Sequence, residues 1–193
     1  RDQPRSRGLG DVYKRQEYYT LNIAGLKREL PLCPINDKLN IAAFIMFSDV
    51  ELTIACAEEL LKRVPDFDII VTAESKGIPL GYELSRQSGK KYIVARKSVK
   101  LYMKNPVAVE VKSITTDGRQ TLYLDENDMR ELKGKRVLIA DDVISTGESL
   151  HSLVELAERA GGNIVCKSAV LAEGDAADRN DIIFLEKLPL FFK

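Results

Sequence analysis

The sequence has 193 residues, of which 45% are hydrophobic and 30% are charged, values typical of a globular chain large enough for one sizeable core. Its 29 basic and 29 acidic residues balance, so we expect no nucleic-acid partner. No apolar run approaches the roughly 20 residues that cross a bilayer, and no apolar signal segment opens the chain. We therefore expect no membrane partner and a cytoplasmic location.

The first 16 residues differ from the rest of the chain. They lack an initiator Met and any apolar rhythm, and they carry five basic residues against two acidic ones. We interpret residues 1–16 as a non-native leader, such as a cloning scar, and residues 17–193 as a single domain. The three cysteines, Cys33, Cys56 and Cys166, are too far apart to resemble a metal cluster or a disulfide framework, and we expect reduced core residues.

The N-terminal part of the domain predicts two kinds of structure. Residues 18–35 are β-prone but interrupted by glycine and proline, and they predict two short strands that form a flap. Ser48 and Glu51 have the spacing of a capping box and predict the start of an amphipathic helix, which Pro65 ends. Its apolar face recurs every three or four residues, at Val50, Ile54, Ala57, Leu61 and Val64.

Short apolar segments then alternate with helical ones. Residues 68–73 predict a strand buried on both faces, residues 78–86 a helix that Gly89 ends, and residues 91–95 a further strand. The later elements are a polar helix at 126–132, a strand at 137–140, a helix ended by Gly161 and Gly162, and strands at 164–172 and 182–185. This alternation indicates an α/β fold with a central parallel sheet, right-handed crossovers and flanking helices.

Residues 106–123 have a different pattern. Apolar residues alternate at 107, 109 and 111, and again at 122 and 124, on either side of Asp117-Gly118. The pattern predicts a long hairpin that projects from the sheet.

The segment at 137–149, VLIADDVISTGES, combines a buried strand, two carboxylates and a Ser/Thr/Gly loop at the start of a helix. Ligands of open α/β folds bind at the carboxyl edge of the sheet, where a helix N-terminus presents unpaired N–H groups to anions. Ser145, Thr146 and Ser149 add hydroxyl donors, and Gly147 lets the backbone approach a phosphate closely. Two adjacent aspartates would repel that phosphate unless they face sugar hydroxyls or a divalent cation. The segment therefore predicts a site for phosphate, ribose and Mg²⁺.

A purely structural interpretation of the same segment is also open. Ser145 and Glu148 are spaced as a capping box, which occurs at many helix starts. The sequence has no GxxxxGK[ST], and no GxGxxG follows a predicted strand. A plain doubly wound scaffold with a fortuitous cap stays an alternative, since a fold alone implies no function.

VLIADDVISTGES resembles the signature of the type I phosphoribosyltransferases, in which a hydrophobic strand leads into two acidic residues and a Ser/Thr/Gly loop. TAESKG at 72–77 is similar to the family's pyrophosphate loop, and ARKSVKL at 95–101 resembles the RKxGKL stretch of its adenine enzymes. GLKRELPL at 25–32 is similar to the segment that precedes the core in that subgroup. The resemblance implies the type I phosphoribosyltransferase fold for residues 17–193. That fold has a central parallel sheet flanked by helices, a small hood subdomain from about 17–36 and 173–193, and a mobile β-hairpin.

The resemblance also implies a reaction and a set of ligands. The substrates are 5-phosphoribosyl pyrophosphate (PRPP) and a purine base, Mg²⁺ is the cofactor, and the enzyme is a homodimer. Asp141 and Asp142 are the catalytic candidates, with Mg²⁺ held mainly through PRPP and in part by these two carboxylates. The candidates for the ribose and the 5′-phosphate are Asp141, Asp142, Val143, Ser145, Thr146, Gly147, Glu148 and Ser149. The candidates for pyrophosphate are Glu74, Ser75, Lys76, Gly77, Arg96, Lys97 and Lys100, with a cis peptide bond between Glu74 and Ser75. The candidates for the base are Lys27, Arg28 and Glu110.

The identity of the base is the point at which the chain departs from the adenine pattern. The hairpin lacks the YxxEYG stretch of the adenine enzymes, so that Glu110 is only a substitute for its glutamate. Val99 and Glu148 stand where the family has small residues. Adenine is the first choice, which would yield AMP and pyrophosphate in purine salvage, and xanthine or guanine is the second. A regulatory protein that binds PRPP without catalysis is a further alternative, although the sequence contains no evident winged-helix segment.

Overall fold

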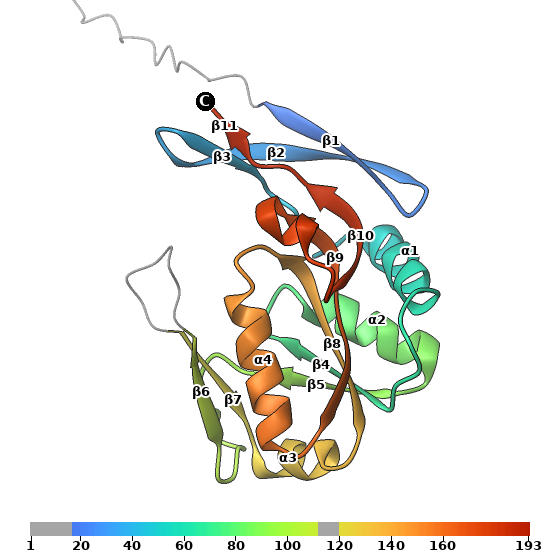
Figure 1. Cartoon of the computed structure of the whole chain (residues 1–193), viewed down its shortest axis with the longest axis vertical. Helices are drawn as coiled ribbons and strands as arrows, with labels where there is room; N and C mark the ends of the chain where they lie inside the picture. Colours follow the sequence, from blue (N-terminus) through green and yellow to red (C-terminus); the bar gives the residue numbers. More distant parts are fainter. Residues whose placement is uncertain (1–16, 112–119) are drawn as a thin grey trace, which may run out of the picture.

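The computed structural model describes residues 17–111 and 120–193. A five-stranded parallel sheet forms its centre, with the strand order β10-β9-β8-β4-β5 (Figure 1). In chain order these strands are β4 (Ile69–Ala73), β5 (Lys91–Ala95), β8 (Arg136–Ile144), β9 (Asn163–Glu173) and β10 (Ile183–Leu188). The predicted central parallel sheet is confirmed.

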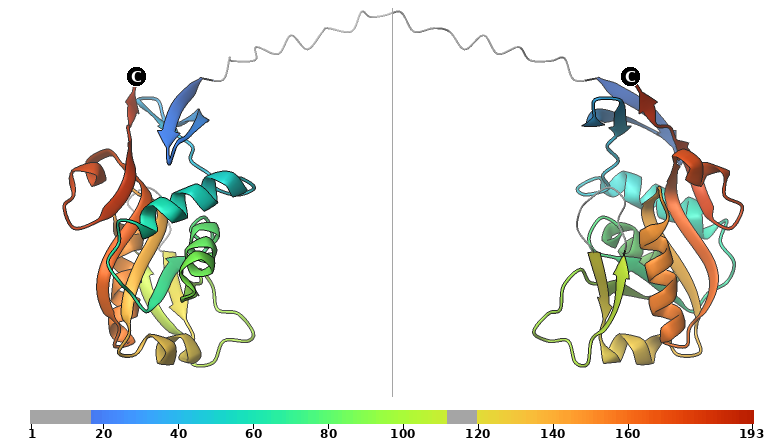
Figure 2. Two further views of the ribbon diagram at one scale, coloured as in Figure 1. Left: turned by 90° about the vertical axis from the view of Figure 1, so that its right-hand side faces the viewer. Right: turned by 60° about the vertical axis from the view of Figure 1, so that its left-hand side comes forward.

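Helices cover both faces of this sheet (Figures 1 and 2). They are α1 (Val50–Leu61), α2 (Ile78–Ser88), α3 (Glu126–Leu132) and α4 (Glu148–Arg159), with a short 3₁₀ helix, η1 (Gly174–Asp178). Side chains alternate between the two faces of a strand, so β8 takes part in two cores. Leu138 and Ala140 pack with α1 and α2, whereas Val137 and Ile139 pack with α3 and α4. The loops at the carboxyl edge of the sheet are thereby held between two packed layers.

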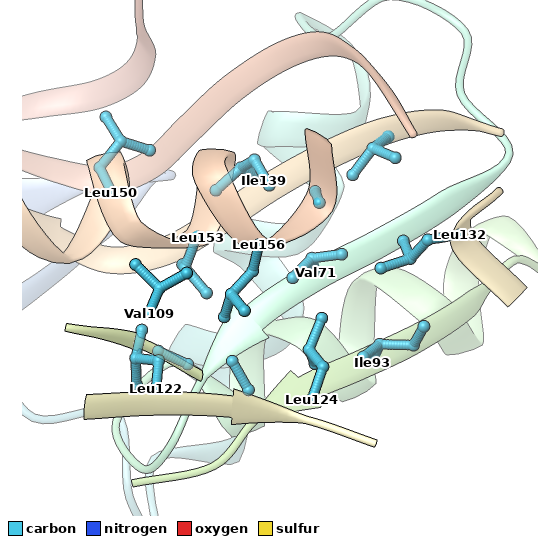
Figure 3. Packing of buried hydrophobic residues seen from close by; sticks show 14 of the residues in the cluster. Val71, Ile93, Val109, Leu122, Leu124, Leu132, Ile139, Leu150, Leu153 and Leu156 are labelled. Carbon is cyan, nitrogen blue, oxygen red and sulfur yellow. The ribbon is translucent and has the colours of Figure 1, made fainter. Parts of the chain in front are cut away.

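The predicted hairpin is present, but its strands do not project freely from the sheet. They are β6 (Val107–Val111) and β7 (Gln120–Leu124), which form a separate antiparallel pair. Val109 and Leu122 are only 3% and 2% exposed, and they lie beside Leu153 of α4 (Figure 3). The expectation of a projecting hairpin is wrong for these strands, because their alternating pattern gives them an apolar face that α4 buries. The hairpin tip at 112–119 lies outside the described residues.

The N-terminal flap is larger than predicted. Its four antiparallel strands have the order β1-β2-β3-β11, so the C-terminal end of the chain completes it (Figure 1). They are β1 (Tyr18–Ile23), β2 (Leu26–Asn36), β3 (Leu39–Ala42) and β11 (Phe191–Phe192). β2 continues through both of its prolines, since Pro31 is the last residue paired with β1 and Pro34 borders a register shift against β3. β3 and β11 are too short for an alternating pattern to identify them.

The start of α1 differs from the prediction by one residue. Ser48 does not cap the helix, because its backbone has a φ of 66°. Asp49 is the N-cap instead, and its Oδ1 accepts a hydrogen bond of 3.1 Å from the amide of Leu52. The predicted capping box between Ser48 and Glu51 is therefore wrong. Glu51 forms an ion pair with Arg28 at 2.7 Å.

Two expectations from composition can be compared with the structure directly. None of the helices in residues 17–111 and 120–193 is long and apolar enough to cross a bilayer. All three cysteines are free, and Cys56 and Cys166 are buried as predicted, whereas Cys33 is half-buried. Burial raises the pKa of the Cys56 thiol to about 12 and that of Cys166 to about 11, so both thiols stay protonated at neutral pH.

Candidate active site

The sheet brings two chemically distinct loops to the same edge. β4 and β8 are parallel neighbours that pair Ile69 with Val137 and Val71 with Ile139, so their carboxyl ends lie side by side. Residues 74–77 follow β4, and the two aspartates occupy the end of β8, which is longer than the predicted strand at 137–140. A cavity of about 170 Å³ is lined by both segments and by Lys97. A second cavity of about 110 Å³ is lined by residues 143–147 and shares Asp141, Val143 and Ser149 with the first.

The acidic pair lies in the first of these two cavities. Asp142 is only 3% exposed, and its Oδ2 has no hydrogen bond within the described part of the chain. Among the described residues, this oxygen forms an ion pair with Lys76, whose Nζ lies 3.2 Å away. Asp141 Oδ1 accepts a hydrogen bond of 2.9 Å from the amide of Asp142. Burial, reinforced by the charge of Asp142, raises the pKa of Asp141 well above its usual range.

The loop after β8 presents backbone N–H groups that have no acceptor among the described residues. Gly147 is the N-cap of α4 with a φ of 82°, and no side chain caps the helix. The alternative of a capping box between Ser145 and Glu148 is therefore wrong. No acceptor is recorded for the amides of residues 145–149 among the hydrogen bonds of the described residues. Together with the positive end of the α4 dipole, these donors suit an anion such as phosphate.

The loop after β4 depends on a glycine. The Glu74-Ser75 peptide bond is cis, as the family resemblance implied. A Cβ atom on Gly77 would lie 2.2 Å from Thr72 Oγ1 and 3.2 Å from Asp141 Oδ1, far closer than van der Waals contact allows in the first case. Only glycine therefore lets the loop lie against both β4 and the acidic pair. Thr72 itself is fully buried, and its Oγ1 has no hydrogen bond in the described residues.

The three basic residues after β5 have different positions. Lys97 lines the cavity of the acidic pair. Arg96 instead binds Glu74, with Nε 3.1 Å from Oε2, and this ion pair holds the pKa of Glu74 below its ordinary value. The amide of Lys97 donates to the same carboxylate at 2.9 Å. Lys100 donates from Nζ to Ser98 Oγ at 2.6 Å and does not line this cavity in the described part of the chain.

Lys27 and Arg28 lie apart from the two cavities, whereas Glu110 lines a cavity that shares Thr146 and Gly147 with the second of them. Lys27 is 3.7 Å from Glu29, and Arg28 Nε is 2.7 Å from Asp49 Oδ2. These contacts place both side chains in the small sheet and give Arg28 a structural role at the start of α1. Glu110 lines another cavity, of about 440 Å³, together with Glu148 and other residues of the α4 N-terminus.

Two residues at the site were not among the predicted site residues. Thr72 lies under Gly77, and Arg179 NH1 lies 2.6 Å from the position of a Cβ on Gly147. Thr72 could have been noticed as a polar residue in an otherwise apolar strand. Arg179 had no local signal, since it lies 32 positions after Gly147, the residue that it contacts.

The donor set at this edge fits Mg²⁺ in part. Asp142 Oδ2 is a buried carboxylate oxygen without a hydrogen bond, and Asp141 lies beside it. Carboxylate oxygens are preferred ligands of Mg²⁺. No cluster of three or more His, Cys, Asp or Glu side chains that could hold a metal occurs in the described ranges. A cation here would therefore take most of its ligands from water and from a bound phosphate compound.

The comparison with protein families agrees with this arrangement. The model of the phosphoribosyl transferase domain matches residues 51–186, which include both loops and the acidic pair. The chain belongs to the phosphoribosyltransferase family.

Relatives within this phosphoribosyltransferase family carry two substrate names. An adenine phosphoribosyltransferase of Acetivibrio thermocellus is 33% identical over 141 residues, which are 72% of this chain and 80% of that protein. A hypoxanthine/guanine phosphoribosyltransferase of Methanocella paludicola is 38% identical over 110 residues, which are 57% of this chain and 54% of that protein. The chain thus spans only about half the length of the second relative.

Solved structures show the same phosphoribosyltransferase fold. The crystal structure of an adenine phosphoribosyltransferase from Thermoanaerobacter pseudethanolicus has a TM-score of 0.63 at 25% identity, covering 74% of this chain and 84% of that one. The adenine phosphoribosyltransferase of Leishmania tarentolae has a TM-score of 0.61 at 19% identity and covers 90% of this chain and 83% of that one. The predicted type I phosphoribosyltransferase fold is confirmed.

Proposed function

We propose that the protein is a purine phosphoribosyltransferase that transfers the 5-phosphoribosyl group of PRPP to a nucleobase, with adenine as the first candidate. One observation carries this proposal: two adjoining cavities share Asp141, Val143 and Ser149. One cavity is lined by the phosphate loop, at residues 143–147 and Ser149, and the other by Lys97 and the loop at 74–77. A ribose that lay over the acidic pair would direct its 5′-phosphate into one cavity and its pyrophosphate into the other.

The reaction needs no side-chain nucleophile. A ring nitrogen of the base forms a bond to C1 of the ribose, the bond from C1 to the pyrophosphate oxygen breaks, and pyrophosphate leaves with the electron pair. The ring nitrogen then releases its proton to solvent. Positive charge develops on the sugar and negative charge on the leaving group, so positioning and charge neutralisation supply most of the catalysis.

Each part of the site has one task in this scheme. The amides at 145–149, with the hydroxyls of Ser145, Thr146 and Ser149, hold the 5′-phosphate. Asp141 and Asp142 accept hydrogen bonds from the ribose hydroxyls. Residues 74–77 and Lys97 hold the pyrophosphate. Mg²⁺, when bound through PRPP and these carboxylates, would neutralise charge on the leaving group.

Lys76 changes partners in this proposal. Its Nζ lies 3.2 Å from Asp142 Oδ2 and neutralises that carboxylate. When PRPP binds, Lys76 turns to the pyrophosphate and releases the Asp142 carboxylate to the ribose. The ion pair thereby keeps a buried carboxylate paired until the substrate supplies hydroxyls in its place.

Two further parts complete the site in the proposal. The small sheet and the residues around η1 and β10 act as a hood over the base, and the hairpin at 106–123 closes over PRPP and excludes water. Leu122 of β7 lines the cavity of the acidic pair, which supports a position of the hairpin beside the bound PRPP. The closure is tested by protease cleavage of the hairpin: donor binding should protect it, and unchanged cleavage would argue against closure.

A homodimer is part of the same proposal. Ile45, Phe47, Val50, Ile54 and Tyr82 are 39–68% exposed and lie on or just before α1 and α2. Four of these side chains line an apolar groove of about 240 Å³. A second copy that covered this surface would bury apolar area that otherwise faces water. Sedimentation of the wild type and of Val50→Glu tests it, and a wild-type monomer would count against the dimer.

The base is tested by pyrophosphate release. Purified protein receives PRPP and Mg²⁺ with adenine, guanine, hypoxanthine or xanthine in separate reactions, and Asp142→Asn and Asp66→Asn serve as the variant and its matched surface control. Release with adenine, lost in Asp142→Asn but kept in Asp66→Asn, is the expected result. Release with guanine or hypoxanthine only would reassign the base, as the name of the Methanocella relative allows. PRPP binding without release would favour the regulatory alternative.

A further inference from the structure

Arg179 reaches the phosphate loop from a distant part of the chain. It follows η1 and precedes β10, yet its NH1 lies 2.6 Å from the point where a Cβ on Gly147 would be. The guanidinium therefore covers the Cα of Gly147. Any side chain at position 147 would displace it, so the glycine is needed both for its φ of 82° and for this contact.

The Arg179 side chain is oriented by the carboxylate of Asp181. Nε donates to Asp181 Oδ1 and NH2 donates to Asp181 Oδ2, each at 2.8 Å, in the two-pronged geometry that best orients a guanidinium. Lys167 Nζ also donates to Asp181, at 2.5 Å. NH1, the nitrogen nearest the loop, has no acceptor recorded in residues 17–111 and 120–193. The paired hydrogen bonds to Asp181 thus leave NH1 available on the side of the loop.

The charges near the loop explain why a cation belongs there. Residues 141–151 contain three acidic residues, Asp141, Asp142 and Glu148, and no lysine or arginine. A 5′-phosphate that entered this segment would meet three carboxylates and only backbone amides and hydroxyls as donors. At the effective dielectric constant of about 20 that is typical near a protein surface, charges a few ångströms apart still attract or repel one another appreciably. Arg179 is the side chain that the structure brings to this loop to offset them.

We propose that Arg179 is a positioning residue of the 5′-phosphate subsite. Its guanidinium, held by Asp181, supports the loop at Gly147 and adds a fixed positive charge beside the bound phosphate. This inference rests on the proposed function, since it assigns a residue to the same PRPP site. It predicts selective recognition of the phosphorylated end of the sugar, with no effect on the pyrophosphate end.

The test compares two probes that occupy different cavities. Ribose 5-phosphate and inorganic pyrophosphate are titrated by calorimetry, in separate experiments, into the wild type, Arg179→Met, Arg179→Lys and Lys187→Met. Lys187 is an exposed cation of β10, 3.8 Å from Asp178, so its replacement removes the same charge from the same region without touching the loop. Thermal melting of each variant controls for folding.

The expected result is a selective loss. Arg179→Met should bind ribose 5-phosphate about tenfold more weakly, and Arg179→Lys about twofold more weakly, because lysine keeps the charge but not the fork. Pyrophosphate affinity should stay the same in all four proteins, and the defect of Arg179→Met should shrink at high salt, as electrostatic effects do. If Arg179 only stabilised the fold, its replacement would not weaken one probe selectively, and the loss of affinity would not depend on salt.

Each contrary result has a separate meaning. Ribose 5-phosphate affinity that is unchanged in Arg179→Met, or equally low in Arg179→Lys and Arg179→Met, would overturn the role given to Arg179. Failure of the wild type to bind either probe would overturn the proposed function as well.

Discussion

Lys76 and Asp142 form an ion pair of 3.2 Å that joins the loop after β4 to the end of β8. The contact links the two halves of the proposed PRPP site. Asp142 is almost fully buried, whereas the Lys76 side chain is 53% exposed, so the lysine is the partner that can move. This asymmetry is consistent with the proposed exchange, in which Lys76 turns from Asp142 to the pyrophosphate.

Replacing Lys76 with methionine should reduce catalysis strongly. The change removes the cation that neutralises the leaving group, and loss of one such stabilising group typically costs about 100-fold or more in rate. Lys76→Arg, which keeps the charge, should retain a larger part of the activity. The measurement is kcat/KM for PRPP by pyrophosphate release, and a value for Lys76→Met within twofold of the wild type would contradict the assignment.

Replacing Gly77 with alanine should distort the loop at 74–77. The new Cβ would lie 2.2 Å from Thr72 Oγ1, and such overpacking typically costs about 1–3 kcal/mol. In the double variant Gly77→Ala with Thr72→Ala the main clash is gone. Its loss of unfolding free energy should therefore be smaller than the sum of the losses in the two single variants. Urea unfolding of the four proteins measures this coupling, and strictly additive effects would show that the clash is not the cause.

Leu122 should be important for stability although it lies in the hairpin. It is 2% exposed and packs against α4, so Leu122→Ala should lower the free energy of unfolding by about 2–4 kcal/mol. Leu101 is fully exposed, and Leu101→Ala should change the free energy of unfolding by less than about 0.5 kcal/mol. Equal effects in urea unfolding would mean that the hairpin strands are not packed as described.

The ion pair between Arg28 and Asp49 should make stability depend on acid pH. Arg28 holds the pKa of Asp49 below its usual value, so the folded protein binds this proton more weakly than the unfolded chain does. The stabilisation is therefore fully present above the unfolded pKa of about 4 and is lost as the pH falls through the lower folded value.

The variant Arg28→Met isolates that contribution. Its free energy of unfolding should be about 1 kcal/mol lower than that of the wild type at pH 7, since the pair is partly buried and well aligned. The difference should narrow below about pH 4, as Asp49 becomes protonated in both proteins. A constant difference between pH 7 and pH 3 would exclude the ion pair as its source.

The sequence was most informative where one segment determines its own structure. The buried strand at 69–73 and the loop with Asp141, Asp142 and Gly147 are local patterns, so the parallel sheet and the acidic edge could be predicted. The start of α1 was missed by one residue because Ser48 and Asp49 are both good caps, and the contact of Asp49 with Arg28, which is distant in sequence, could not be read from the local pattern.

Features that depend on distant contacts could not be predicted in the same way. β11 exists because two aromatic residues near the C-terminus pair with β3, which no local pattern records. The anchoring of the hairpin depends on Leu153 of α4, and the position of Arg179 depends on how the segment after η1 folds back to Gly147. In each case the local sequence is compatible with several conformations, and tertiary packing determines which one forms.

Calorimetric titration of PRPP with Mg²⁺ tests the central claim most directly, namely that the edge formed by β4 and β8 is a PRPP site. The wild type should bind one PRPP per chain, Asp142→Asn should bind about tenfold more weakly or worse, because a charged hydrogen-bond acceptor is lost, and Asp66→Asn should bind as the wild type does. Absence of PRPP binding by the wild type, or equal affinity in Asp142→Asn, would contradict the claim.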